Sequence, residues 1–503
     1  MFESKYSKYV INNTTRFAED DEIVKGLSPI DKGAGVPLFE MNGDVYVDNL
    51  DNHSITIGGT GCGKSRAVCK SLIRSIILNN ESGIINDPKG ELYKATANLA
   101  EKKGYNVKVL NLRKPECSDR WNPLSLIYLY YSMGELSKAQ QAIDDFSTDL
   151  MTKTANKDDR YWDMVSASYF SKIIEMCMMV GKRETHITLE NILPLCNESG
   201  ETTLKQMMYY IPDLSEAIKS SLNAVLELKA EKTKSCIYGV LHTGLDSLVK
   251  NESLLRLFSG NDISFYKLAD APTLIYVIYP DEKTSMNNVV KCFLTQAYTA
   301  LLDVCEMRED DKLPIRVNFV LDEFSNLTAV ENFDNRISES RSKGIRYHLF
   351  CQSMNQLSEK YGENVAETIL SNCTSWICFS SKETKFLDSI SRLCGKVIDY
   401  NGMEKPLISS SEIQFLSKGE NGVEVLILRQ GVRPYVAQLP YFDKMYPSDK
   451  LAKLVEVKRD ELKPLKLKLL DWSRLANELR REHKNDHKVD TSEIIDWMLD
   501  GHF

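Results

Sequence analysis

The sequence lacks several features that would assign its class at once. No apolar run approaches the roughly 20 residues of a membrane-spanning helix, and the start, MFESKYSKYVINN, has no apolar stretch of a signal peptide. The 12 cysteines form no Cys-x-x-Cys pair and no cluster with His at zinc spacing, so we interpret them as reduced thiols. These absences exclude a disulfide-rich or zinc-stabilised domain and predict a protein of the cytoplasm.

Excess positive charge is also missing. The 503 residues include 63 Lys and Arg against 71 Asp and Glu, which gives a formal net charge of −8. This balance excludes a globally basic nucleic-acid coat protein, so any polyanion must be bound by local basic surface. A hydrophobic fraction of 43% and a charged fraction of 27% are close to the globular average and exclude a fibrous or wholly disordered chain.

Short apolar runs alternate with helical patterns in the first part of the chain. In order, the strand-like and helix-like segments are 54–57, 65–78, 83–85, 91–103 and 107–110. This alternation predicts right-handed crossovers and a parallel sheet. Just before it, Asn42-Gly43 predicts the turn of a hairpin, because both residues tolerate positive φ.

The β pattern fades from about Leu124 to Leu268, where long helical patterns replace it, and then returns. The later strand-like runs are 273–279, 315–321, 347–351, 375–379 and 423–428. We therefore predict an α/β fold whose parallel sheet is built from both sides of an all-helical insertion.

The strongest functional motif is GGTGCGKS at 58–65, which follows a predicted strand and opens a predicted helix, as a P-loop does. Its glycines let backbone amides face an anion, Lys64 reaches the terminal phosphates, and Ser65 holds Mg²⁺. Thr60 and Cys62 occupy free positions of the motif, although Cys62 must lie close to bound phosphate. We expect ATP and Mg²⁺ as cofactors. The expected nucleotide-binding residues here are Gly58, Gly59, Thr60, Gly61, Cys62, Gly63, Lys64, Ser65 and Arg66.

A second motif supplies the acids that a P-loop needs. The apolar run 315–321 ends in Asp322 and Glu323, as a Walker B strand does. Asp322 is expected to orient Mg²⁺ through its water shell, and Glu323 to activate the attacking water as general base. The presence of Glu323 favours hydrolysis over nucleotide binding alone.

Polar residues flank the next predicted strand. Gln352 follows it at the carboxyl edge of the sheet, where it could sense the γ-phosphate or serve as an ordinary surface cap. Arg336, Arg341 and Arg346 precede it on a basic helix and turn. One of the three could act in trans as an arginine finger in a ring of subunits, and a solvated basic face is the alternative.

Longer strings extend these motifs. They are DPKGE at 87–91, WNPL at 121–124, Tyr161-Trp162, LDEF at 321–324, SRSKGI at 340–345 and CQSMNQLSEKYG at 351–362. Over roughly Val36 to Pro440 the chain thus resembles the type IV coupling proteins of conjugation and type IV secretion, the TraG/TrwB type.

The resemblance implies a RecA-like nucleotide-binding domain interrupted by an all-alpha domain, and a homo-hexameric ring that moves single-stranded DNA, often with a bound relaxase. By motif position it assigns nucleotide and Mg²⁺ contacts to Lys64 and Ser65, the Walker B acids to Asp322 and Glu323, the sensor to Gln352 and the arginine finger to Arg341. Asp87 and Lys89 of the DPKGE string join the expected nucleotide-binding residues, with pore contacts an open alternative for Lys89.

The periodicity, the motifs and the resemblance together predict five segments. They are an N-terminal arm at 1–35, a first nucleotide-binding part at 36–128, an all-alpha domain at 129–268, a second nucleotide-binding part with Walker B and sensor at 269–445, and a charged helical tail at 446–503. Most members of the resembled family begin with two membrane-spanning helices, and this chain has none. It is either trimmed or of a form that docks on a separate membrane subunit.

The expected function is ATP-driven recruitment and translocation of single-stranded DNA with its relaxase. The expected partners also include the secretion channel and membrane-anchor proteins, at the inner face of the cell membrane. Two alternatives stay open: a receptor ATPase for protein effectors, and a nucleotide-switched scaffold with negligible turnover.

Overall fold

The computed structural model describes residues 15–151, 160–249, 252–280, 282, 284–399, 401–447, 462 and 469–484. The chain divides into two compact units, each made of three segments. The sheet unit comprises residues 1–114, 264–283 and 297–460, and the helical unit comprises residues 115–263, 284–296 and 461–503.

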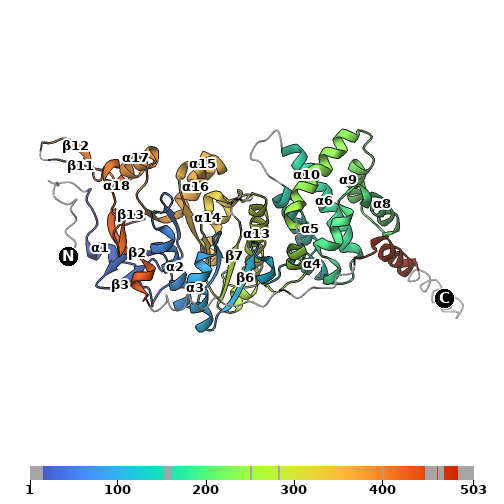
Figure 1. The fold of residues 1–503 in the computed structure, drawn as a ribbon, viewed down its shortest axis with the longest axis horizontal. Coiled ribbons are helices and arrows are strands. Elements are labelled where there is room, and N and C mark those ends of the chain that lie inside the picture. Colours follow the sequence, from blue (N-terminus) through green and yellow to red (C-terminus); the bar gives the residue numbers. More distant parts are fainter. Residues whose placement is uncertain are drawn as a thin grey trace, which may run out of the picture. The chain divides into compact units, whose positions relative to one another are not determined.

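A nine-stranded sheet with the order β14-β13-β10-β4-β9-β8-β5-β7-β6 forms the sheet unit's centre (Figure 1). Its strands are β4 (His53–Ile57), β5 (Ser82–Asn86), β6 (Asn106–Asn111), β7 (Thr273–Ile278), β8 (Val317–Leu321), β9 (Ile345–Cys351), β10 (Cys373–Cys378), β13 (Gly422–Arg429) and β14 (Tyr435–Pro440). Every neighbouring pair from β10 to β6 is parallel. Because β5 lies between β8 and β7, strands from both sides of the insertion alternate, which confirms the predicted α/β class.

One edge of the sheet differs from the prediction. Strand β13 pairs antiparallel with β10, and β14, which the sequence did not predict, pairs antiparallel with β13. A strand-like run carries no information on its direction, and β14 alternates buried and half-buried residues instead of forming a continuous apolar run. The parallel core therefore ends in an antiparallel hairpin.

The predicted hairpin is confirmed. Strands β2 (Pro37–Met41) and β3 (Asp44–Val47) pair antiparallel across Asn42 and Gly43, whose φ angles are 55° and 89°. Strand β1 (Ser28–Pro29) extends them to a three-stranded sheet, so the described end of the predicted N-terminal arm is structured.

Helices pack against the large sheet through fully buried apolar side chains. Leu72, Ile73, Ile76 and Ile77 of α2 are all fully buried in one cluster with residues of the strands. The helices of this unit are α1 (Asp20–Val24), α2 (Lys70–Leu78), α3 (Glu91–Lys102), α12 (Lys267–Asp270), α14 (Phe333–Lys343), α15 (Met354–Tyr361), α16 (Glu363–Asn372), α17 (Thr384–Leu393), α18 (Ser410–Gln414) and α19 (Phe442–Met445). A small hairpin of β11 (Lys396–Ile398) and β12 (Glu404–Pro406) lies between α17 and α18 in the chain.

A buried polar network crosses the amino ends of the central strands. Arg346 of β9 is fully buried and pairs with Glu81, while its Nε donates to Asn318 Oδ1 at 2.9 Å and one Nη to the carbonyl of Ala34 at 2.8 Å. Arg346 therefore cannot serve as an arginine finger, which corrects one of the three candidates. Arg341 and Arg336 remain on α14.

His53 of β4 joins the neighbouring strand β9 to α14. Its Nδ1 accepts from the amide of Tyr347 at 2.9 Å, and its Nε2 donates to the carbonyl of Ile337 at 2.8 Å, which assigns the neutral form. Burial, together with the charges of Arg341 and Arg346, lowers the pKa of His53 to about 4.

We expect His53 to make the fold sensitive to acid. Because its folded-state pKa lies below the unfolded value, its contribution is full above about pH 6.5 and is lost as pH falls toward 4. Between pH 7 and pH 5 the free energy of unfolding of the wild type should fall by about 2 kcal/mol more than that of His53→Asn. Urea unfolding at each pH measures the difference. Parallel pH profiles of the two proteins would contradict it.

The helical unit is built from α-helices that differ widely in length. They are α4 (Ser125–Ser132), α5 (Leu136–Met151), α6 (Arg160–Val180), α7 (Leu189–Ile192), α8 (Glu201–Tyr210), α9 (Glu216–Leu226), α10 (Glu231–Val249) and α11 (Glu252–Leu257), with the first part of α13 (Thr284–Glu306). A buried ion pair of 2.9 Å joins Lys291 of α13 to Asp149 of α5. Within the described residues, no helix combines the length and apolarity that a bilayer crossing demands.

The described end of the predicted tail belongs to the helical unit. A helix over residues 472–484 begins at Trp472, which is 2% exposed and donates its indole N–H to the carbonyl of Asn191 at 2.8 Å. The tail's other residues, except 446, 447, 462 and 469–471, lie outside the described part of the chain.

Candidate nucleotide site

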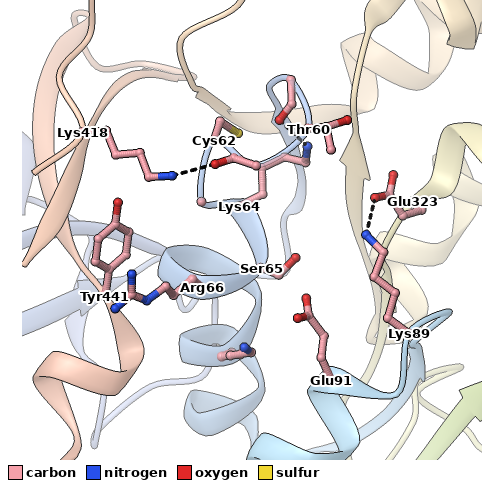
Figure 2. A pocket seen from close by; sticks show the side chains of 14 residues that line it. Thr60, Cys62, Lys64, Ser65, Arg66, Lys89, Glu91, Glu323, Lys418 and Tyr441 are labelled. Carbon is pink, nitrogen blue, oxygen red and sulfur yellow. Dashed lines mark hydrogen bonds and ion pairs between the residues drawn. The ribbon is translucent and has the colours of Figure 1, made fainter. Parts of the chain in front are cut away.

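The P-loop lies at the carboxyl end of β4, where the sequence predicts it. Gly61 and Gly63 adopt φ angles of 74° and 112°, which side-chain-bearing residues rarely tolerate. The loop then enters a single π-helical turn, η1 (Ser65–Cys69), which continues into α2. It lines a pocket of about 290 Å³, shown in Figure 2, so its amides can surround an anion.

Lys64 and Ser65 occupy the positions that phosphate and Mg²⁺ binding require. The Lys64 ammonium is largely buried and donates to the carbonyl of Gly58 and, at 3.4 Å, to that of Gly59. The Ser65 hydroxyl donates to Asp322 Oδ2 at 3.5 Å, which joins the P-loop to the end of β8. The structure thus brings together two motifs that lie about 250 residues apart in sequence.

Asp322 is a buried carboxyl whose charge needs a partner. Burial, followed by the nearby charges of Glu323 and Asp87, raises its pKa to about 7, while Lys64 acts in the opposite direction. A cation bound between Asp322 and Ser65 would neutralise this charge. The residues present therefore fit Mg²⁺, which takes one or two protein oxygens and completes its shell with water and phosphate oxygens. Consistently, the described residues contain no group of three or more His, Cys, Asp and Glu placed to hold a metal alone.

Glu323 points into the pocket with both carboxylate oxygens in contact with donors. Gln352 Nε2 donates to Oε2 at 2.7 Å, and Lys89 Nζ lies 3.5 Å from Oε1 (Figure 2 shows the Lys89 contact). The Thr60 hydroxyl donates in turn to Gln352 Oε1 at 3.1 Å. A chain of contacts therefore runs from the P-loop through Gln352 to Glu323 and Lys89.

The sequence did not indicate the role of Thr60 in this chain. Strands β4 and β9 are parallel neighbours, with Ile57 opposite Cys351, so the residues that follow them lie side by side. Knowledge of the strand order would have predicted the Thr60–Gln352 contact, but the sequence alone did not supply that order.

The DPKGE string forms the turn between β5 and α3. Asp87 does not line the pocket; its Oδ2 accepts from the amide of Tyr93 at 2.8 Å at the start of α3. Burial raises the pKa of Asp87 to about 6. Lys89, by contrast, lines the pocket directly, together with Glu91.

The opposite end of the pocket holds Arg66, which the sequence predicts there, together with residues that the motifs do not include. Arg66 pairs with both oxygens of Asp443 at 2.5 and 2.7 Å, and its guanidinium lies 4.0 Å from the ring centre of Tyr441. Lys418 donates to the carbonyl of Gly61 at 2.7 Å. Figure 2 shows Arg66, Tyr441 and Lys418 on the opposite side of the P-loop from Glu323. Lys418, Tyr441 and Asp443 lie more than 350 residues after the loop in the sequence, and no local motif indicated them.

Two other predicted residues are placed as follows. Burial raises the pKa of the Cys62 thiol, so this thiol is less reactive than its place in the loop suggests. Arg341 is exposed in the last turn of α14, which leads into the amino end of β9, whereas the pocket lies at the carboxyl end of β4. Arg341 does not line this pocket.

Fold and site together define a class: a RecA-like P-loop fold with Walker A and Walker B residues at the carboxyl edge of its parallel sheet. The chain matches the profile of the family described as "Type IV secretory system Conjugative DNA transfer" over residues 4–405, and it therefore belongs to that family. The predicted resemblance is confirmed.

Curated relatives agree with this assignment. The chain is 24% identical over 369 residues to "Conjugal transfer protein TraG" of Escherichia coli, a match that covers 69% of this chain and 55% of the relative. It is 23% identical over 390 residues to "Type IV secretion system-coupling protein VirD4" of Bartonella quintana (strain Toulouse), covering 74% of this chain and 57% of the relative. The chain thus spans little more than half the length of these relatives.

Solved structures show the same fold. The plasmid coupling protein TrwB in complex with the ATP analogue ADPNP matches with a TM-score of 0.64 at 14% identity, covering 91% of this chain and 97% of TrwB. TrwB in complex with ADP and Mg²⁺ matches with a TM-score of 0.59 at 14% identity, covering 86% and 94%. At this identity the likeness establishes the fold alone.

Proposed function

We propose that the protein is an ATP-hydrolysing coupling protein that recruits single-stranded DNA with its bound relaxase and drives it into a type IV secretion channel. The observation that carries the ATPase proposal is the convergence of Lys64, Ser65 and Glu323 on one pocket, with Asp322 accepting from the Ser65 hydroxyl. Family membership supports the role in DNA transfer. The TrwB complexes with ADPNP and with ADP and Mg²⁺ support the proposed cofactors.

The geometry supports a direct hydrolytic step. Lys64 and the loop amides bind the β- and γ-phosphates, and Ser65 and Asp322 are placed to hold Mg²⁺, which neutralises phosphate charge when bound. Glu323 accepts a proton from water while the water oxygen bonds to the γ-phosphorus. The bond from that phosphorus to the β–γ bridging oxygen breaks, and ADP and phosphate leave. Gln352, held by Thr60 and Glu323, is placed to sense the γ-phosphate.

The proposed assembly is a homo-hexamer with its sites between subunits. Arg341 is exposed, does not line the pocket of its own chain and stands at the end of a helix, so as an arginine finger it would serve the neighbouring subunit. We place the ring at the inner face of the cell membrane, beside the secretion channel and its membrane-anchor proteins.

The ATPase rate per subunit should rise steeply with protein concentration, and single-stranded DNA should increase it, because a complete site needs two subunits. Steady-state phosphate release across a dilution series measures this. Arg341→Ala should abolish the concentration dependence without weakening nucleotide binding by the monomer. Arg392→Ala, an exposed arginine near the end of α17, is the matched control.

A rate that is independent of concentration, of Arg341 and of DNA would contradict the DNA-driven ring. Stimulation by a secreted protein in place of DNA would favour a receptor ATPase for protein effectors. Nucleotide binding without turnover under every condition would favour the nucleotide-switched scaffold.

A further inference from the structure

The contacts of Glu323 leave it poorly placed to accept a proton. A general base needs a free carboxylate oxygen facing the attacking water. Here Gln352 Nε2 donates to one oxygen at 2.7 Å, and the Lys89 ammonium lies 3.5 Å from the other. In this arrangement both oxygens of Glu323 are therefore engaged by donors, and neither is free to face the attacking water.

Lys89 is the partner that can move. The Glu323 side chain is 9% exposed, and its backbone has a φ of 52° at the start of η6 (Phe324–Asn326). The Lys89 side chain is 55% exposed. Lys360 of α15 donates to the carbonyls of Ser325 and Leu327 and fixes the loop that carries Glu323. Release of the base thus requires movement of Lys89 and not of Glu323.

The DPKGE string holds the backbone of Lys89 in place. Asp87 accepts from the amide of Tyr93 through its side chain and, at 3.1 Å, from the amide of Gly90 through its carbonyl. Gly90 has a φ of 69°, which closes the turn ahead of α3. Arg113 Nε donates to the carbonyl of Pro88 at 2.8 Å. The turn is therefore rigid, while the Lys89 side chain projects from it into the pocket.

The γ-phosphate of ATP would compete with Glu323 for this ammonium. The pocket that Lys89 lines also contains Lys64 and the P-loop, so a bound triphosphate brings its terminal, most negative group between Lys64 and Glu323. ADP lacks this group and leaves no competing anion at that end. The contact between Lys89 and Glu323 should therefore respond to the third phosphate alone.

We propose that Lys89 exchanges partners during the ATPase cycle. It holds Glu323 in the nucleotide-free and ADP-bound states, and it moves to the γ-phosphate when ATP binds, which frees one oxygen of Glu323 for the attacking water. Lys89 is thus both a contact to the substrate and the switch that couples nucleotide state to the general base. This proposal rests on the proposed ATPase function.

Equilibrium binding of ADPNP and ADP to the full chain tests the exchange. Lys89→Met keeps the length of the side chain and removes its charge, so affinity for ADPNP should fall about tenfold, as expected for one lost charged contact, while ADP affinity stays within about twofold. Lys89→Arg should restore most of the ADPNP affinity. Lys94→Met, an exposed lysine on the outer side of α3, is the control and should change neither affinity. An equal loss of affinity for ADPNP and ADP in Lys89→Met, or no loss of affinity for either, would overturn the proposal.

A crystal structure of the wild type with ADPNP and Mg²⁺ tests the movement itself. Lys89 Nζ should lie beyond about 4 Å from the Glu323 carboxylate, outside ion-pair range, and should contact a γ-phosphate oxygen. Lys89 still paired with Glu323 would overturn the exchange. Wild-type protein that binds neither nucleotide would instead refute the proposed ATPase, so the two failures are distinguishable.

Discussion

Replacing Glu323 by glutamine should reduce ATP turnover by about 10²-fold to 10⁴-fold, the usual contribution of a general base, while nucleotide affinity changes little. Glutamine has the shape of glutamate and can occupy the same left-handed backbone position, but its amide cannot accept a proton from water. The pocket and the P-loop contacts should therefore remain intact. Single-turnover hydrolysis and ADPNP binding measure the two effects separately.

The control for this variant is Glu339→Gln, an exposed glutamate on α14 that makes no contribution to the pocket. It should hydrolyse ATP at the wild-type rate. Wild-type turnover in Glu323→Gln would refute the assignment of Glu323 as base, and loss of ADPNP binding would show that it acts on the fold of the site instead.

Replacing Glu81 by glutamine should lower the free energy of unfolding by about 3–5 kcal/mol, because it leaves the charge of Arg346 buried and unpaired. Arg346 is fully buried, and Glu81 is its carboxylate partner; Glu81 also pairs with Arg316 at 2.5 Å. The remaining contacts of Arg346 are to neutral oxygens of Asn318, Ala34 and Leu50. The unfolding transition of the sheet unit in urea measures this loss of free energy.

A surface pair supplies the comparison. Glu404 pairs with Lys396 at 2.9 Å, and both side chains are about two-thirds exposed, so Glu404→Gln should cost less than about 1 kcal/mol. The double variant Glu81→Leu with Arg346→Met should recover most of the stability, because it removes both buried charges. Equal small effects at Glu81 and Glu404 would contradict the account of the network.

Most strands and the two nucleotide motifs could be predicted because each depends on local sequence. The Walker B acids directly follow a single apolar strand, and the P-loop needs only its own glycines and lysine. Arg346 was misplaced because the predicted strand began at Tyr347, two residues late, which left Arg346 on an exposed turn. Inside the strand it has no route to solvent.

What could not be predicted depends on which strands become neighbours. The Thr60–Gln352 contact needs β4 beside β9, and the Arg66–Asp443 pair needs the last strands to form an antiparallel edge. Apolar periodicity reports burial but not the neighbour or direction of a strand. The packing of Trp472 was missed for a related reason, since one buried indole within a charged segment does not change its average composition.

The connection between β6 and β7 has a consequence for how such proteins diverge. These strands are hydrogen-bonded neighbours, yet residues 115–263 lie between them in the chain. The helical unit is therefore an enlarged crossover, and recombination there could exchange it as a cassette without reordering the sheet. The cassette is not self-contained, because it also includes 284–296 of α13 and the helix over residues 472–484, which Trp472 anchors. A viable exchange must therefore transfer three separate gene segments together. Because segments of the sheet unit lie between them, the helical unit tends to be inherited with the ATP site.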